Sequence, residues 1–494
     1  MSRRYPTLSR AGFLLPDRIQ ARYEGAAEGP RSASWDAPDS GVNTLVMPAL
    51  RNLRSRSRAA TRNDPYAYSA IDKRVSNLIG TGITPRPQLK DDALRHQMQD
   101  LWSDWVDEAD ADGLTDFYGV QALVARTVET SGECFIRLRP RRLSDGYAVP
   151  LQVQVLAPEF VPHDKFQALG NGNSIRAGIE FNRIGQRVAY WMYRAHPGDS
   201  YGQHVGYNQL VRVPAAQVLH IYEPLEPGQL RGVPRLTPVL KRLRSLDNYD
   251  DAVLFRQEVA NLFAGFIRKP APEVGMEPRD PITGAPMQMA GDGFTPMVAL
   301  EPGTMQELMP GEEVEFSDPP DAGNHYPDFM RQQLQAAAVG AGLPYELMSG
   351  DMRDVNDRAL RVLLNEFRRR LEQQQFGVYV HQLCRPTRAA WLDMAVLSGA
   401  LTLPDYAKRR REYLRTRWVP QGWAYIHPVQ DVQSRMLEVN AGFASRSEMV
   451  LRTGYDAETV DEENAADAQR ARDKQLNYKT LNLPDWGKED EEAR

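Results

Sequence analysis

Two stretches with apolar residues at helical spacing flank a short polar segment in the second half of the chain. In the first, Phe329, Leu334 and Val339 lie roughly on one side, and the glycines and proline at 340, 342 and 344 favour its end. The second stretch spaces its apolar residues by four, three, four and seven positions: Leu360, Leu364, Phe367, Leu371 and Val378. We expect a helix over residues 325–343, a projecting polar loop over residues 344–357, and a second helix capped by Asp354.

Residues 63–235 mix helical and alternating patterns. Asn63-Asp-Pro65 predicts a helix start, because a capping residue precedes a proline at the first helical position. Further along, apolar residues alternate with polar ones in five short runs, as expected for strands. The runs contain Cys134, Ile136 and Leu138; Leu151, Val153 and Val155; Ile179 and Phe181; Val188, Tyr190 and Met192; and Val218, His220 and Tyr222. The pattern predicts an α+β unit with an antiparallel or mixed sheet.

A long helix is predicted over residues 236–266. Its cations are Lys241, Arg242, Arg244 and Arg256. The next segment, residues 267–324, is rich in Pro, Gly and Met, with short alternations that indicate strands. We expect a small inserted subdomain between two long helices.

The two ends of the chain differ in charge. Residues 1–62 carry many arginines among Ser, Pro and Gly, which is typical of a solvated basic arm, although an arm of this kind can also lie on a neighbour or on phosphates. Residues 358–430 should contain the long helix and the segment after it, and residues 431–494 further helices and an acidic tail.

Composition narrows the class of protein. The chain has 494 residues, enough for several domains, and a formal net charge of -5, which argues against a protein that coats nucleic acid over its whole surface. Its two cysteines form no metal-ligand spacing, so we expect a reduced protein made in cytoplasm. We find no apolar run of membrane-spanning length and no signal peptide, and we expect no membrane association.

Motifs for chemistry are missing from the sequence. We find no phosphate-binding Gly-rich loop with Lys, no His-Glu-x-x-His, no Cys-x-x-Cys and no Gly-x-Ser-x-Gly, and we expect no cofactor and no catalytic residues. Asp351, Asp354 and Asp357 invite a metal site, but Arg353 stands where a calcium ligand belongs. An alternative hypothesis is a metal-dependent nucleic-acid-processing enzyme that uses these three aspartates.

Several strings in collinear order, over roughly residues 50–460, resemble the portal proteins of tailed bacteriophages, specifically the lambda-type portal family. The strings are Asp64-Pro-Tyr-Ala-Tyr-Ser-Ala-Ile71, Ile79-Gly-Thr-Gly-Ile-Thr-Pro-Arg-Pro87, Asp116-Phe-Tyr-Gly-Val-Gln121, Ser131-Gly-Glu-Cys-Phe-Ile-Arg-Leu-Arg-Pro140, Val155-Leu-Ala-Pro-Glu-Phe-Val-Pro162, Arg231-Gly-Val-Pro-Arg235, Gly342-Leu-Pro-Tyr-Glu-Leu-Met348 and Trp418-Val-Pro-Gln-Gly-Trp423.

The resemblance implies a ring, normally of twelve subunits, at the unique capsid vertex of a virion assembled in bacterial cytoplasm. Double-stranded DNA would pass through its channel during packaging and ejection. The terminase large subunit, and later head-completion or tail adaptor proteins, would dock on it, and the major capsid or scaffold protein would surround it. A monomeric adaptor inside a virion head is a further possibility.

The same resemblance assigns parts of the portal fold. Residues 63–235 would be an α+β wing, residues 236–266 and 325–343 a two-helix stem, residues 267–324 a β-containing clip, and residues 431–494 a helical crown. Within residues 344–357, the tunnel loop would be formed by Ser349, Gly350, Asp351, Met352, Arg353, Asp354, Val355 and Asn356.

Charge in the loop and stem agrees with a conduit. A channel that passes DNA should hold few unpaired cations, because each phosphate contact strengthens binding. Arg353 is offset by Asp351 and Asp354. The stem cations Lys241, Arg242, Arg244 and Arg256 could meet phosphates, but we favour pairs between subunits, because ring closure needs complementary contacts.

Overall fold

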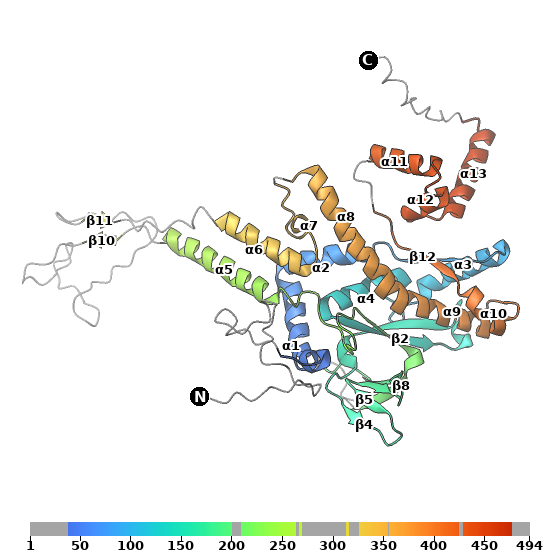
Figure 1. Ribbon diagram of the computed structural model, residues 1–494, viewed down its shortest axis with the longest axis horizontal. Coiled ribbons are helices and arrows are strands. Elements are labelled where there is room, and N and C mark those ends of the chain that lie inside the picture. Colours follow the sequence, from blue (N-terminus) through green and yellow to red (C-terminus); the bar gives the residue numbers. More distant parts are fainter. Residues whose placement is uncertain are drawn as a thin grey trace, which may run out of the picture.

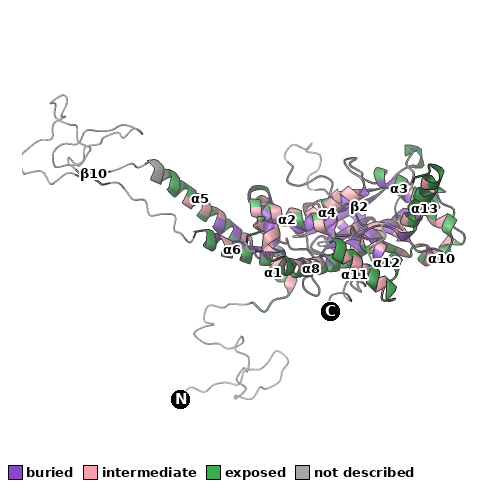
Figure 2. Cartoon of the chain, turned by 90° about the horizontal axis from the view of Figure 1, so that it is seen from above, coloured by how far each residue is buried: buried purple, intermediate pink, exposed green. Residues whose placement is uncertain are grey.

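The computed structural model describes residues 38–199, 209–262, 266–268, 313–315, 326–353, 355–423 and 428–476. An α+β body carries two long helices, α5 (Leu240–Leu262) and α6 (Tyr326–Ala341), which project from it side by side (Figure 1). Towards the far end of α5 most residues are exposed, among them Leu254 and Phe255 (Figure 2). The predicted α+β class is confirmed.

Two antiparallel sheets form the β part of the body. In the first, β2 (Glu133–Pro140) lies between β3 (Leu151–Leu156) and β9 (Val218–Tyr222). The second has five strands in chain order: β4 (Gln167–Ala168), β5 (Ser174–Arg176), β6 (Ile179–Phe181), β7 (Arg187–Tyr193) and β8 (Leu210–Pro214). All five predicted runs are strands. The sequence pattern did not indicate β4, β5 or β8.

Helices α2 (Pro65–Leu78), α3 (Asp92–Glu108) and α4 (Phe117–Ser131) contribute to the main core beside the first sheet. The predicted helix start is confirmed, because the Asp64 carboxylate accepts hydrogen bonds from the backbone N–H groups of Tyr66 and Ala67. Trp102, Trp105, Phe117 and Trp391 form an aromatic cluster with ring centroids 4.8–5.5 Å apart. Aromatic pairs of this kind dominate core energetics.

The prediction of a solvated arm over residues 1–62 is wrong for its last third. Helix α1 (Val42–Asn63) packs against α2 and α4 and buries Leu50 and Arg54. The first 37 residues lie outside the described part of the chain. Local composition was misleading because Arg54 and Arg58 of α1 have partners far along the chain, Glu133 and Glu159.

A long helical rod follows the loop after α6. It begins as α8 (Asp357–Gln374), continues through wider π-helical turns (Gln375–Cys384) and ends as α9 (Arg385–Ser398). Of the predicted apolar stripe, Phe367, Leu371 and Val378 are buried, whereas Leu360 and Leu364 are half-buried. The apolar side predicted for α6 is wrong in two of its three residues, because Phe329 and Val339 are exposed and only Leu334 is buried. The buried face consists of Met330, Leu334, Ala337, Ala338 and Ala341.

The remaining elements complete the body. Strand β1 (Thr84–Pro87) pairs with β12 (Thr416–Val419), and α10 (Tyr406–Tyr413) precedes β12. Helices α11 (Pro428–Asn440), α12 (Arg446–Arg452) and α13 (Ala457–Asp473) follow. Beyond α5, β10 (Phe266–Arg268) pairs with β11 (Glu313–Glu315), while the rest of the predicted clip lies outside the described residues. Among the helices that are described, none has the length and apolarity needed to cross a membrane.

Candidate functional site: the loop between α6 and α8

The loop contains a short helix that the sequence pattern did not predict. Gly342, at φ +77°, ends α6, and α7 (Tyr345–Ser349) runs from Pro344 to Gly350, at φ +74°. Both glycines occupy the left-handed region, which other residues rarely adopt. Residues 351–356 then lead to α8, whose N-cap is Asn356 rather than the predicted Asp354; the Asn356 side chain accepts from the Arg358 backbone N–H at 2.9 Å. Asp354 lies outside the described residues.

The arginine of the loop is paired with a carboxylate of the same loop. The Arg353 guanidinium donates two hydrogen bonds to the Asp351 carboxylate, of 2.9 and 2.8 Å, and the Tyr345 hydroxyl donates a third at 3.0 Å. This pairing with Arg353 holds the pKa of Asp351 well below its usual range. The Arg353 side chain is 72% exposed. The predicted offset of Arg353 by Asp351 is confirmed, and the loop presents a neutral pair to solvent.

A buried charge network, which we call the Glu129 network, fixes the base of the loop. Arg74 of α2 donates to Glu129 of α4 at 2.8 Å, to the Gly342 carbonyl at 2.8 Å, and to Gln374 of α8 at 2.7 Å. Burial alone would raise the pKa of Glu129, but Arg74 and Arg235 lower it. One guanidinium therefore connects α2 and α4 to the start of the loop at Gly342 and to the C-terminal end of α8.

Glu223 extends the Glu129 network toward the surface. Its carboxylate accepts from Arg235 at 2.5 Å, from Gln374 at 2.7 Å, and from Arg370. Arg235 lies shortly before α5 and also pairs with Glu129 at 3.4 Å. The junction of α4, the segment before α5 and the end of α8 is thus held by charges that compensate one another.

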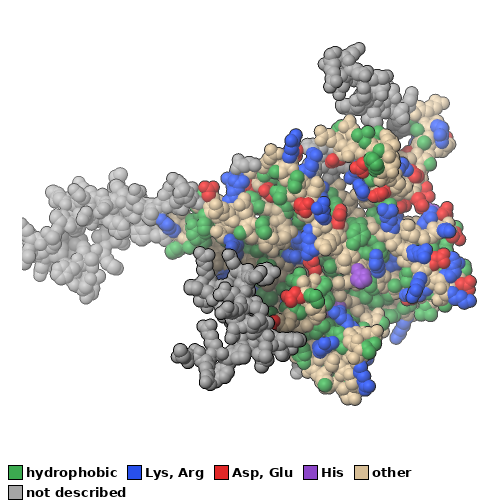
Figure 3. Space-filling model, viewed as in Figure 1, with side chains coloured by type: hydrophobic (Ala, Val, Ile, Leu, Met, Phe, Trp, Pro, Cys, Tyr) green, Lys and Arg blue, Asp and Glu red, His purple; other side chains and the backbone are tan. Residues whose placement is uncertain are grey.

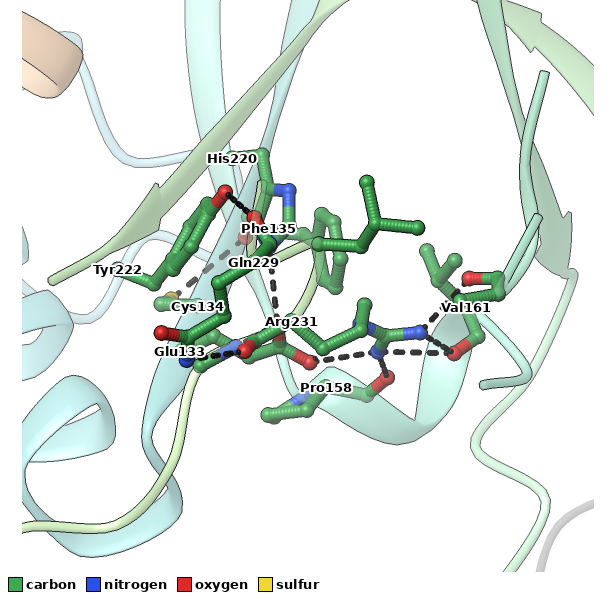
Figure 4. A network of polar contacts seen from close by, with 12 residues as sticks. Glu133, Cys134, Phe135, Pro158, Val161, His220, Tyr222, Gln229 and Arg231 are labelled. Atoms are coloured by element: carbon green, nitrogen blue, oxygen red, sulfur yellow. Dashed lines mark hydrogen bonds and ion pairs between the residues drawn. The ribbon is translucent and has the colours of Figure 1, made fainter. Parts of the chain in front are cut away.

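A second buried network, the Glu133 network, joins α1 to the first sheet through Arg54. Figure 4 shows its Glu133, Arg231 and His220 side chains. Glu133 accepts from Arg231 at 2.7 Å, from the Gly232 backbone N–H at 2.8 Å, and from Arg54. The other nitrogens of Arg231 donate to the backbone carbonyls of Pro158, Val161 and Ala177 at 3.0–3.2 Å. Burial would raise the pKa of Glu133, but Arg231 and Arg54 hold it well below its usual range.

His220 closes the Glu133 network. Its ring lies flat against Phe135, with centroids 4.3 Å apart, and its Nε2 lies 2.9 Å from Glu133. Burial lowers the pKa of His220 to about 4, from 6.5. The folded protein therefore holds a neutral imidazole here, and its Nε2–H donates to the carboxylate.

We expect stability to fall between pH 7.5 and 5 because of His220. In this range the unfolded chain takes up a proton that the folded protein does not bind, so acid favours unfolding by about 2 kcal/mol. His220→Gln keeps a donor for Glu133 but cannot titrate. Urea-unfolding midpoints at both pH values should show a smaller acid-induced drop for His220→Gln than for the parent, and equal drops would contradict the assignment.

The predicted stem cations form contacts within the chain where the structure describes them. Arg242 of α5 donates to Gln333 of α6 at 2.5 Å, and Arg244 pairs with Asp247 one turn further at 2.8 Å. Lys241 and Arg256 are exposed. Arg242 and Arg244 thus have partners in their own subunit, and pairing between subunits remains a prediction.

The described residues do not support metal binding by the aspartates of the loop. The Asp351 oxygens are occupied by Arg353 and Tyr345, and Asp357 is exposed at the start of α8. Within the described ranges, no group of three His, Cys, Asp or Glu side chains is placed to hold a metal ion.

An apolar groove of about 490 Å³, which we call the loop groove, lies beside the loop. It runs between the end of α6, α7 and α8, and its lining includes Val339, Leu343, Pro344, Leu363 and Phe367. Val339 is 79% exposed and Leu363 45% exposed. Contiguous apolar surface of this kind commonly marks a contact with another molecule.

A family profile described as phage portal protein, lambda family, matches residues 28–375. The chain therefore belongs to the lambda family of phage portal proteins. The resemblance that the motifs indicated is confirmed.

Curated relatives agree with this assignment. A probable portal protein of Halomonas phage phiHAP-1 is 25% identical over 503 residues, covering 99% of this chain and 90% of that protein. Portal protein B of Escherichia phage lambda is 21% identical over 487 residues, covering 92% of this chain and 91% of that protein. Among solved structures, the neck of an empty gene transfer agent particle shares 15% identity at a TM-score of 0.43, covering 82% of this chain and 93% of that one. That structural likeness carries no functional argument.

Proposed function

We propose that this protein is the subunit of a portal ring, normally of twelve copies, that forms the DNA channel at one vertex of a phage capsid. The role is structural rather than enzymatic. The observation that carries the proposal is the loop after α6: it projects from packed helices, its base is fixed by the Glu129 network, and its exposed arginine is neutralised by Asp351. A loop whose arginine is already paired with a carboxylate suits a constriction past which DNA must slide, because each cation–phosphate contact would strengthen binding.

The distribution of surface charge supports the same interpretation. On the face shown in Figure 3, Lys and Arg side chains are interspersed with Asp and Glu over the body. Strong nucleic-acid binding is typical of a clustered basic surface, because each phosphate that a Lys or Arg contacts adds to the affinity. A cation that pairs with a neighbouring carboxylate contributes less. We infer that the ring guides DNA and does not bind it tightly.

The loop groove is the surface that we assign to a neighbouring copy. In a ring each subunit contacts its neighbours through two different surfaces, and burial of apolar area drives such contacts. Val339 and Leu363 would remain in water in an isolated subunit. Their position beside the loop would bring neighbouring loops together around one axis.

We expect Val339→Asp to shift rings toward monomers, because a carboxylate in a desolvated interface is costly. Leu397→Asp is the matched control, since Leu397 is 81% exposed but does not line the loop groove. Native mass spectrometry of both variants provides the measurement, with a chain mass of 55.8 kDa. If the Val339→Asp variant forms rings as stable as those of the control, the loop groove is not part of the interface between copies.

The remaining partners are also part of the proposal. Terminase and head-completion or tail adaptor proteins would dock on the clip, residues 267–324, most of which lies outside the described residues. The capsid or scaffold protein would contact the outer wing, and the assembled ring would reside in the virion. Binding of purified terminase to the parent protein, but not to a variant with the clip replaced by a short linker, would support this assignment.

A further inference from the structure

A groove of about 670 Å³, which we call the arginine groove, lies between the α8–α9 rod, β12 and the helices α11 and α12. Four arginines line it, one each from α9, β12, α11 and α12. Its lining also contains large apolar side chains. The arginines are Arg385, Arg417, Arg435 and Arg452, and the apolar residues include Phe376, Trp418, Val419 and Leu451.

The walls of the arginine groove are held in place by the Trp418–Trp423 segment. A side chain at Gly422 would come within 2.5 Å of the Thr453 backbone, so only glycine permits the close approach of α12. The Gln421 side-chain oxygen Oε1 accepts a hydrogen bond from the Thr81 backbone N–H at 2.9 Å, and the Trp423 ring lies 5.5 Å from the Arg368 guanidinium carbon. These contacts therefore fix the shape of the arginine groove within the subunit.

Positive charge is in excess in this groove. Glu372 is its one lining carboxylate, and Arg452 pairs with Glu448 at 3.0 Å and with Glu438 at 3.9 Å, outside the lining. Arg385 and Arg417 are exposed, and among the described residues neither has a carboxylate within ion-pair distance. An anionic occupant would meet two guanidinium groups at little desolvation cost.

We propose that the acidic segment 485–494 of the same copy binds in the arginine groove. This segment contains five carboxylates, namely Asp485, Glu489, Asp490, Glu491 and Glu492, and also Trp486, with Leu481 and Leu483 shortly before it. Its carboxylates match the arginines, and its apolar side chains match the apolar lining. A polyphosphate would satisfy only the arginines, so an acidic peptide fits better than nucleic acid.

The segment is long enough to reach the groove. Helix α13 begins five residues after Arg452, a lining residue, and its 17 residues extend about 25 Å from there. The 18 residues from 477 to 494 span up to about 60 Å when extended. The chain can therefore return past α13 to the groove, and tethering keeps its local concentration high.

Carbodiimide cross-linking of the full-length chain tests the proposal. Arg417→Lys keeps the charge and provides an amine, which carbodiimide joins to a carboxylate in contact with it. We expect mass spectrometry to find position 417 linked to residues 489–492, at about tenfold the yield seen for Arg411→Lys, an exposed arginine outside the groove. High salt should lower the yield, and replacing the four carboxylates of 489–492 by amides should abolish it.

Three outcomes would overturn the proposal. One is a yield at position 417 no higher than for Arg411→Lys. Another would come from a mixture of isotopically labelled and unlabelled copies, if every cross-link joined two different copies and none lay within one copy. The third is a background yield at position 417 together with loss of duplex DNA binding in the double variant Arg385→Glu and Arg417→Glu, which would make the groove a nucleic-acid surface. The cross-link forms within one copy and does not require a ring. Its outcome therefore tests this proposal even if the portal proposal is wrong.

Discussion

Glu133→Gln is expected to destabilise the subunit by about 3–5 kcal/mol, because it leaves buried cations without their counter-charge. Glu133, Arg54 and Arg231 are all at most 2% exposed, and the one carboxylate accepts hydrogen bonds from both arginines. Burial already lowers the pKa of Arg54 to about 10 with Glu133 present. Urea unfolding followed by circular dichroism measures the change.

Two companion variants separate the network from a general loss of charge. Glu159→Gln removes a half-buried carboxylate that pairs with Arg58 at 2.9 Å, and we expect it to cost about 1 kcal/mol or less. Adding Arg54→Met to Glu133→Gln should recover part of the loss, since one unpaired cation is removed. A Glu133→Gln variant as stable as Glu159→Gln would show that the arginines find other compensation.

Shortening the loop between Ser349 and Asn356 is expected to reduce DNA packaging or retention to background while rings still assemble. The loop projects beyond the Glu129 network, and its Asp351–Arg353 pair is exposed, so its removal leaves the packed helices intact. Nuclease-protected DNA in assembled particles measures packaging, and electron microscopy counts the rings.

Shortening the exposed turn between β6 and β7, residues 183–185, gives the matched control. It removes a similar length of surface loop far along the chain from the proposed constriction, and packaging should persist. If the shortened tunnel loop instead prevents ring assembly, the segment is a core element of the subunit and the channel role assigned to it is wrong.

Local patterns predicted the parts of the fold that local physics decides. The Asp64 cap, the alternating strands and the buried face of α8 each follow from residues close together in sequence. The neutral Asp351–Arg353 pair was equally predictable, because its members are two positions apart. For such features, periodicity and charge in a short window suffice.

Features that depend on distant partners could not be predicted. Arg54 is buried because Glu133 lies opposite, and 79 positions separate them. The buried face of α6 includes Ala337, Ala338 and Ala341, whose small side chains give a weak periodic signal, whereas the larger Phe329 and Val339 are 42% and 79% exposed. Periodicity counts large apolar residues and does not tell whether a given one lies in the core or at the surface.

Electron cryo-microscopy of the purified full-length protein tests the central claim most directly. The account predicts closed rings with an axial hole, in which the α7–α8 loops of all copies, with Arg353 paired to Asp351, face the axis and the loop groove is filled by a neighbouring copy. Monomers without rings, or rings whose loops point away from the hole, would contradict it.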